Sequence, residues 1–119
     1  MTTIHTLSDI HLEFVGEGAF SKRLRKDYYK NTTGADILVL AGDVTPNIRQ
    51  YRRFLAVVAQ EYDEVVAVAG NHEFYGHNFY SQMVDLKELF DERSNTHFLD
   101  NEFIELKGVR FFGAHAGRI

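Results

Sequence analysis

Two apolar runs constrain the fold of this chain most strongly. The segments DILVLAG, residues 36–42, and EVVAVAG, residues 64–70, are rich in aliphatic residues and end in glycine. Continuous apolar runs of this length are typical of strands buried on both faces of a parallel sheet. Between the runs, apolar residues recur at spacings of three and four, which predicts a helix with one apolar face. These residues are Ile48, Tyr51, Leu55, Val58 and Tyr62.

Further elements extend this strand–helix–strand unit in both directions. Residues 4–7 predict a short first strand, and residues 13–35 predict a loop with a poorly defined helix. Thr45 and Pro46 predict the start of the first long helix, with Pro46 at the first helical position. A second helix is predicted by a stripe of apolar residues at helical spacing. This stripe consists of Phe79, Met83, Leu86 and Phe90.

The C-terminal third predicts small strands. They are THFLD at residues 96–100, EFIEL at 102–106 and VRFFGA at 109–114, and the last two are joined by a hairpin turn at Lys107–Gly108. The whole order is βαβαβ followed by small strands, which predicts an α/β fold with a mostly parallel sheet, right-handed crossovers and a small C-terminal hairpin. We expect residues 1–119 to form a single domain.

Composition narrows the classes of function. The chain has 45% hydrophobic and 25% charged residues, as ordinary globular proteins do. Its formal net charge of −4 gives no overall electrostatic reason to expect a nucleic-acid partner. There are no cysteines, so any metal site must use His, Asp, Glu or Asn. Without a signal-peptide pattern or a membrane-length apolar run, we expect a cytoplasmic protein with no membrane partner.

Polar residues of metal-binding type follow all three predicted parallel strands. Each set alone has an ordinary explanation: the SDIH sequence with Asp9 and His11 occurs by chance, Gly42–Asp43 is a common turn, and GNHE at residues 70–73 fits a turn with an exposed histidine. Together they stand at the carboxyl ends of neighbouring strands, where ligands bind in parallel α/β sheets. Asp9 and His11 point the same way in an extended chain, and Gly42 and Gly70 permit sharp turns. We therefore predict one shared site for a divalent cation.

The succession D-x-H, G-D and G-N-H-E resembles the calcineurin-like metallophosphoesterase superfamily. The segment GNHEFYG in particular is similar to small bacterial and phage phosphohydrolases. The resemblance implies a divalent-metal enzyme that hydrolyses phosphate mono- or diesters through a metal-activated water, and a fold that is the N-terminal half of a metallophosphoesterase sandwich. Mixed oxygen and nitrogen ligands suit Mn²⁺, Fe or Zn²⁺, with one or two ions bound.

The resemblance also implies roles for individual residues. Asp9 and His11 would bind the first metal, Asp43 would bridge both metals as a catalytic carboxylate, and Asn71 would bind the second metal through its amide oxygen. His72 would be catalytic, donating a proton to the leaving alkoxide or stabilising its charge. Glu73 would orient one of the ligands.

This chain departs from the family pattern in its C-terminal half. Family members continue to a later metal-binding histidine, a Gly-His-x-His motif and a second sheet, whereas this sequence stops at residue 119. The expectation is a truncated domain that retains three ligands for the first metal and two for the second. Its uncovered sheet face and the strands EFIEL and VRFFG predict self-association, since exposed apolar edges favour pairing with another copy.

Three hypotheses about function remain open. The chain is a metal-dependent phosphoesterase, a non-catalytic metal- or phosphate-binding remnant that acts through self-association or a protein partner, or a fragment without a function of its own. The basic stretch Lys22–Lys30 is either a solvated helix face or a contact for a nucleic-acid or polyanionic substrate. Tyr75 and His77 either shape a substrate pocket or lie on the surface, and His115 is either a substitute ligand or a tail residue. We interpret His5 and His97 as structural or surface residues.

Overall fold

The computed structural model describes residues 1–114 and has two sheets and three α-helices. The larger sheet contains β1 (Ile4–Leu7), β2 (Ile37–Leu40), β3 (Glu64–Ala67) and β4 (Thr96–Phe98), all parallel and in sequential order. A two-stranded antiparallel hairpin is formed by β5 (Glu102–Leu106) and β6 (Val109–Gly113). The prediction of an α/β fold with a mostly parallel sheet and a C-terminal hairpin is confirmed.

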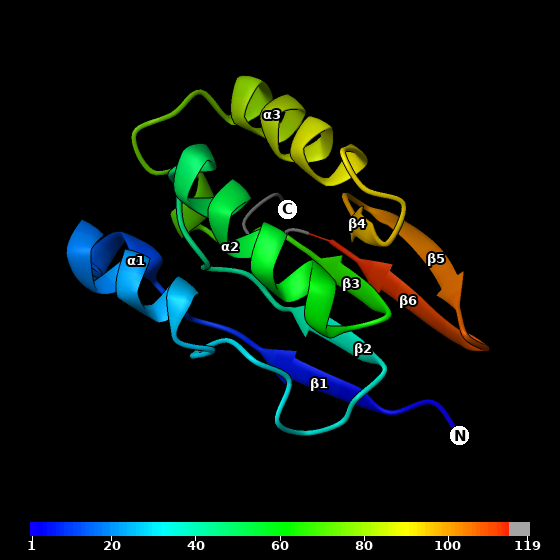
Figure 1. Cartoon of the computed structure of the whole chain (residues 1–119). Coiled ribbons are helices and arrows are strands. Elements are labelled where there is room, and N and C mark those ends of the chain that lie inside the picture. Colours follow the sequence, from blue (N-terminus) through cyan, green and yellow to red (C-terminus); the bar gives the residue numbers. More distant parts are fainter. Residues whose placement is uncertain (115–119) are drawn as a thin grey trace.

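The helices connect the parallel strands and contribute to a single core. They are α1 (Glu17–Arg25), α2 (Ile48–Glu61) and α3 (Phe79–Asp91), and Figure 1 shows them gathered on one side of the sheet. Tyr51 and Leu55 of α2 and Leu86 of α3 are fully buried against strand residues such as Leu38 and Val65. The apolar spacings predicted from the sequence are therefore the core-facing positions of α2 and α3.

The long helix α2 begins two residues later than the sequence suggests. We predicted that Pro46 occupies its first position, but Asn47 is the cap and the helix starts at Ile48. The Asn47 side chain accepts a hydrogen bond from the backbone N–H of Gln50 at 3.0 Å, so it satisfies one of the free donors of the first turn. Thr45 instead accepts a hydrogen bond from the backbone N–H of Asn47 at 3.1 Å.

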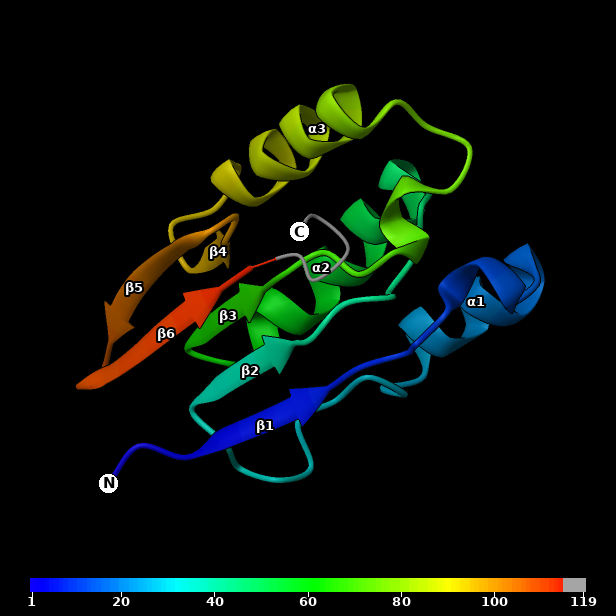
Figure 2. The same cartoon turned by 180° about the vertical axis from the view of Figure 1, so that it is seen from behind.

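The hairpin packs against the face of the sheet that the helices leave open (Figure 2). Ile104 and Phe111 join a second, smaller apolar cluster with Ile37 and Val66 of the sheet. The turn lies at Lys107–Gly108 as predicted, and positive φ at both residues matches the turn type that suits a two-residue hairpin.

The outer face of the same hairpin carries exposed aromatic residues. Phe103 and Phe112 are partners in the strand register and are 66% and 65% exposed. Ile4, at the start of the edge strand β1, is 44% exposed. An apolar surface thus remains open on this side of the described residues.

The helices of residues 1–114 lack the combination of length and apolarity that crossing a bilayer requires.

Candidate metal centre

The carboxyl ends of β1, β2 and β3 meet at one edge of the sheet, and the predicted ligands follow them there. The segment after β1 runs beside the segment after β2, with the backbone N–H of Asp9 donating to the Gly42 carbonyl at 3.2 Å and that of His11 donating to the Asp43 carbonyl at 3.0 Å. These backbone hydrogen bonds extend the alignment of the two strands beyond the sheet. They hold the predicted ligands of the two loops side by side.

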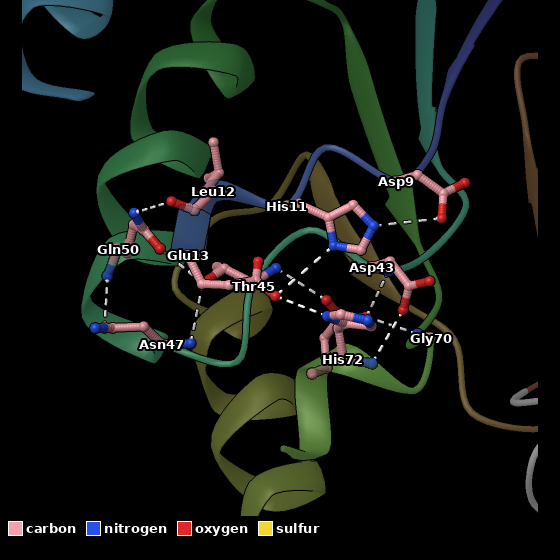
Figure 3. Close-up of polar contacts among 11 residues, drawn as sticks. Asp9, His11, Leu12, Glu13, Asp43, Thr45, Asn47, Gln50, Gly70 and His72 are labelled. Carbon is pink, nitrogen blue, oxygen red and sulfur yellow. Dashed lines mark hydrogen bonds and ion pairs between the residues drawn. The ribbon is translucent and has the colours of Figure 1, made fainter. Parts of the chain in front are cut away.

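Asp9, His11 and Asp43 form one cluster, shown in Figure 3. Each residue offers an oxygen or nitrogen atom, and these atoms all lie within 4.8 Å of one another. The Nε2 atom of His11 is 3.6 Å from Oδ1 of Asp9. The Asp9 side chain is 66% exposed, whereas that of His11 is 26% exposed, so the cluster opens to solvent on the Asp9 side.

The backbone at these ligands differs from the sequence expectation. We expected Asp9 and His11 to lie on extended chain, but both adopt left-handed conformations, with φ of 55° and 49°. Asp43 is also left-handed, with φ of 58°. Such conformations are uncommon for residues with a Cβ and cluster at functional sites, where surrounding contacts hold them in place.

Gly42 and Gly70 bring the ends of β2 and β3 into backbone contact. A Cβ on Gly42 would lie 2.9 Å from the nitrogen of Gly70, and one on Gly70 would lie 2.7 Å from the nitrogen of Asp43. We predicted that both glycines permit sharp turns. Gly42 does so with φ of 97°, whereas Gly70 is needed for the close approach rather than for a positive φ.

Glu73 lies behind the cluster and anchors the turn that carries Asp43. It is 1% exposed, and its Oε1 accepts from the backbone N–H groups of Asp43 at 2.8 Å and Gly70 at 2.6 Å, while Oε2 accepts from that of Thr45 at 2.9 Å. Burial raises the pKa of the Glu73 carboxyl, and these backbone hydrogen bonds oppose the rise. Glu73 thus contacts the main chain of Asp43.

His72 and Asn71 occupy the start of the short helix η2 (His72–Phe74). The backbone N–H of His72 donates to Oδ1 of Asp43 at 3.0 Å, which fixes one carboxylate oxygen. Asn71 is exposed, and its side chain makes no capping hydrogen bond to this helix. The structure therefore places Asn71 in the loop that also carries His72, with its side chain open to solvent.

Glu13 is a member of the site that our sequence analysis missed. It lies on the short helix η1 (Leu12–Phe14), and its Oε2 is 2.8 Å from Nδ1 of His72 and 3.7 Å from Nδ1 of His11. The Glu13 carboxylate raises the pKa of the His72 imidazole, and the negative charges of Asp43 and Glu73 add to this effect. The spacing D-x-H-x-E, with Glu13 two residues after His11, was the sequence signal that Glu13 belongs to the site. Its contact with His72 depends on the turn of η1, which directs the side chain back toward that ring.

The remaining histidines of residues 1–114 have hydrogen-bond partners away from this cluster. His5 bonds the Tyr62 hydroxyl at 2.9 Å and His97 bonds Glu64 at 2.7 Å, while His77 bonds the Pro46 carbonyl at 2.8 Å. Exposed Tyr75 has its ring centroid 4.3 Å from that of His72 and borders the site. His115 lies outside the described residues.

The cluster has the chemistry of a divalent-metal site. Carboxylate oxygens and imidazole nitrogens together suit Mn²⁺, Fe and Zn²⁺. The ligand atoms of Asp9, His11 and Asp43 converge within 4.8 Å of one another, which places them within reach of one cation. The residues present therefore fit a bound cation.

Comparison with known proteins agrees with this interpretation. The sequence model of the calcineurin-like phosphoesterase family matches residues 2–119. The chain belongs to this family. It shares the metallophosphoesterase fold with a phosphopantetheinyl hydrolase from Mycobacterium tuberculosis, with a TM-score of 0.67 at 21% identity over 89% of this chain and 38% of that chain. At this identity the likeness concerns the fold alone.

A similar sequence occurs in a virus. An uncharacterized protein of Acanthamoeba polyphaga mimivirus is 29% identical over 122 residues, which cover 96% of this chain and 44% of the viral protein. The chain thus spans less than half the length of both proteins. The resemblance inferred from the D-x-H, G-D and G-N-H-E motifs is confirmed.

Proposed function

We propose that this phosphoesterase chain hydrolyses phosphate mono- or diesters with the help of one or two divalent ions. The observation that carries the proposal is the cluster of Asp9, His11 and Asp43, whose ligand atoms lie within 4.8 Å of one another at the carboxyl ends of parallel strands. Membership of a family of phosphoesterases supports phosphate esters as the substrate class.

In this proposal Asp9, His11 and Asp43 hold the first ion, and Asp43 with the amide oxygen of Asn71 holds a second. A bound divalent ion supplies a Lewis acid that lowers the pKa of water and neutralises charge on phosphate oxygens. His72 donates a proton to the leaving alkoxide or stabilises its charge, since its backbone N–H is bonded to Asp43 and its imidazole lies beside that of His11, with 4.4 Å between the ring centroids. Glu73 holds the backbone of Asp43 in place.

The test is turnover of p-nitrophenyl phosphate and its bis-ester by the metal-free full chain with added Mn²⁺, Fe²⁺ or Zn²⁺. We expect hydrolysis to require a divalent ion, to stop on chelation and to return when the ion is restored. Hydrolysis that persists in the chelated protein would contradict the proposal.

A second candidate function is a non-catalytic metal- or phosphate-binding module. The observation that favours this module is the small number of donors for the second ion. Among the described residues, only Asp43 and Asn71 are assigned to that ion. Calorimetry separates the two candidates: saturable binding of Mn²⁺ or inorganic phosphate without turnover of either ester would identify the binding module.

We also expect the chain to self-associate through the hairpin. The paired Phe103 and Phe112 present an exposed apolar surface on the outer face of β5 and β6, and covering it removes that area from water. A light-scattering concentration series should show a mass above that of the monomer, and replacing both phenylalanines by aspartate should restore the monomer. Val84→Asp, on the exposed face of α3, is the matched control. A wild-type monomer at high concentration would contradict this prediction.

A further inference from the structure

One carboxylate oxygen of Glu13 faces the Nδ1 atoms of both His11 and His72 (Figure 3). Its Oε2 is 2.8 Å from Nδ1 of His72 and 3.7 Å from Nδ1 of His11, and the two ring centroids are 4.4 Å apart. The Glu13 side chain is 17% exposed, so it is more enclosed than either histidine. One enclosed carboxylate therefore faces the same nitrogen of both rings.

We propose that Glu13 is a positioning residue that orients the imidazole of His72. The inference rests on the proposed phosphoesterase function for its kinetic consequence, but its structural part concerns only the chain's own side chains. In this role Glu13 touches neither the substrate nor the reacting atoms. It acts through His72.

The chemistry follows from what a carboxylate can do. An ionised carboxylate only accepts hydrogen bonds, so a ring nitrogen that faces it at 2.8 Å must carry the proton. For neutral His72 this selects the tautomer with hydrogen on Nδ1, so Nε2 carries no hydrogen. The proton that His72 donates therefore leaves Nε2 of the doubly protonated ring, while Nδ1–H stays bonded to Glu13. A hydrogen bond to one ring nitrogen also fixes the orientation of the ring.

The same carboxylate also lies near His11. The Nε2 of His11 lies near Asp9, on the side of the predicted metal ligands, while its Nδ1 faces Glu13 at 3.7 Å. This separation is too long for a hydrogen bond, so Glu13 places negative charge beside His11 and fixes the ring of His72 alone.

The alternative role for Glu13 is direct metal ligation. Glu13, His11 and His72 also place ligand atoms within 4.8 Å of one another. Two observations favour positioning: Oε2 is already at hydrogen-bond distance from His72, and the Glu13 side chain is far less exposed than that of Asp9, 17% against 66%. Ligation is therefore an outcome that the experiment must be able to detect.

The first test uses the metal-free full chain and needs no activity. Ring nitrogen correlations in ¹⁵N-labelled protein, recorded at a pH where His72 is neutral, report which nitrogen carries hydrogen. We expect the Nδ1–H tautomer in the wild type and in Glu13→Gln, whose carbonyl oxygen still accepts, and loss of that preference in Glu13→Ala. An unchanged His72 tautomer in Glu13→Ala would overturn the proposal.

The second test is kinetic and compares the same two variants. Glu13→Ala should lower kcat about 10- to 100-fold with little change in KM, and Glu13→Gln should retain most of the activity. The loss in Glu13→Ala should be larger for an alkyl phosphate than for p-nitrophenyl phosphate, because the aryl oxide needs less help from a proton donor. Glu88→Ala, on the exposed face of α3, is the matched control.

The outcomes separate the two hypotheses. If Glu13→Gln is as inactive as Glu13→Ala and also loses Mn²⁺ affinity, the charge of Glu13 is required, and the positioning role is replaced by metal ligation. If the wild type shows no turnover, the proposed function fails, whereas the tautomer measurement still decides the role of Glu13. Urea denaturation of both variants identifies any loss of activity that arises from unfolding.

Discussion

Replacing Asp43 by asparagine is expected to lower kcat/KM for phosphate esters by at least about 10²- to 10³-fold. The amide of the new side chain would keep an oxygen that accepts the backbone N–H of His72, so the fold of the turn should survive. The variant would lose the negative charge that the cluster with Asp9 and His11 offers to a cation. The apparent Kd for Mn²⁺, measured by calorimetry, should rise by at least about 100-fold, the upper end of what residues that only orient a ligand produce.

The control for this experiment is Asp91→Asn at the exposed end of α3, which makes the same chemical change away from the site. It should leave both turnover and Mn²⁺ affinity unchanged. If Asp43→Asn retained wild-type turnover and affinity, Asp43 would be only a turn residue and the proposed function would be wrong.

Replacing Glu73 by alanine is expected to lower the free energy of unfolding by about 2–5 kcal/mol. The Glu73 carboxylate accepts from three backbone N–H groups, those of Asp43, Thr45 and Gly70. Each donor left buried without a partner costs about 1–3 kcal/mol, and water that enters the vacated space recovers part of that cost. Urea denaturation measures the change.

Two companion variants sharpen the Glu73 experiment. Glu73→Gln should be less damaging than alanine, because one carbonyl oxygen can still accept from Asp43 and Gly70 while the amide group opposes the N–H of Thr45. Glu88→Ala, on the exposed face of α3, should change the free energy of unfolding by less than about 0.5 kcal/mol. A Glu73→Ala protein as stable as this control would contradict the anchoring role.

The regular elements of this fold were predictable because their signals are local. The apolar runs of β2 and β3 and the helical spacings of α2 and α3 reflect burial, which repeats along the chain with the period of each element. The start of α2 was wrong by two residues because Thr45, Pro46 and Asn47 all favour a helix start. Only the contact between Asn47 and the N–H of Gln50 decides among them.

The site was predictable in its position and less so in its geometry. Asp9, His11 and Asp43 follow strands, and a parallel sheet necessarily brings such residues to one edge. Their left-handed backbone was not predictable from the motif, because it depends on hydrogen bonds between two loops more than 30 residues apart. Glu13 was missed for the same reason, since the turn of η1 rather than its spacing from His11 directs it to His72.

The left-handed backbone at Asp9, His11 and Asp43 means that stability and the proposed function oppose each other at this edge of the sheet. Glycine adopts this conformation more readily than any residue with a side chain, so glycine at these positions would relieve strain. A library of variants selected for thermal tolerance alone would therefore accumulate glycine there and lose the proposed metal ligands. Retention of aspartate and histidine under such selection would require the cation itself to be present, because a bound ligand stabilises the folded chain.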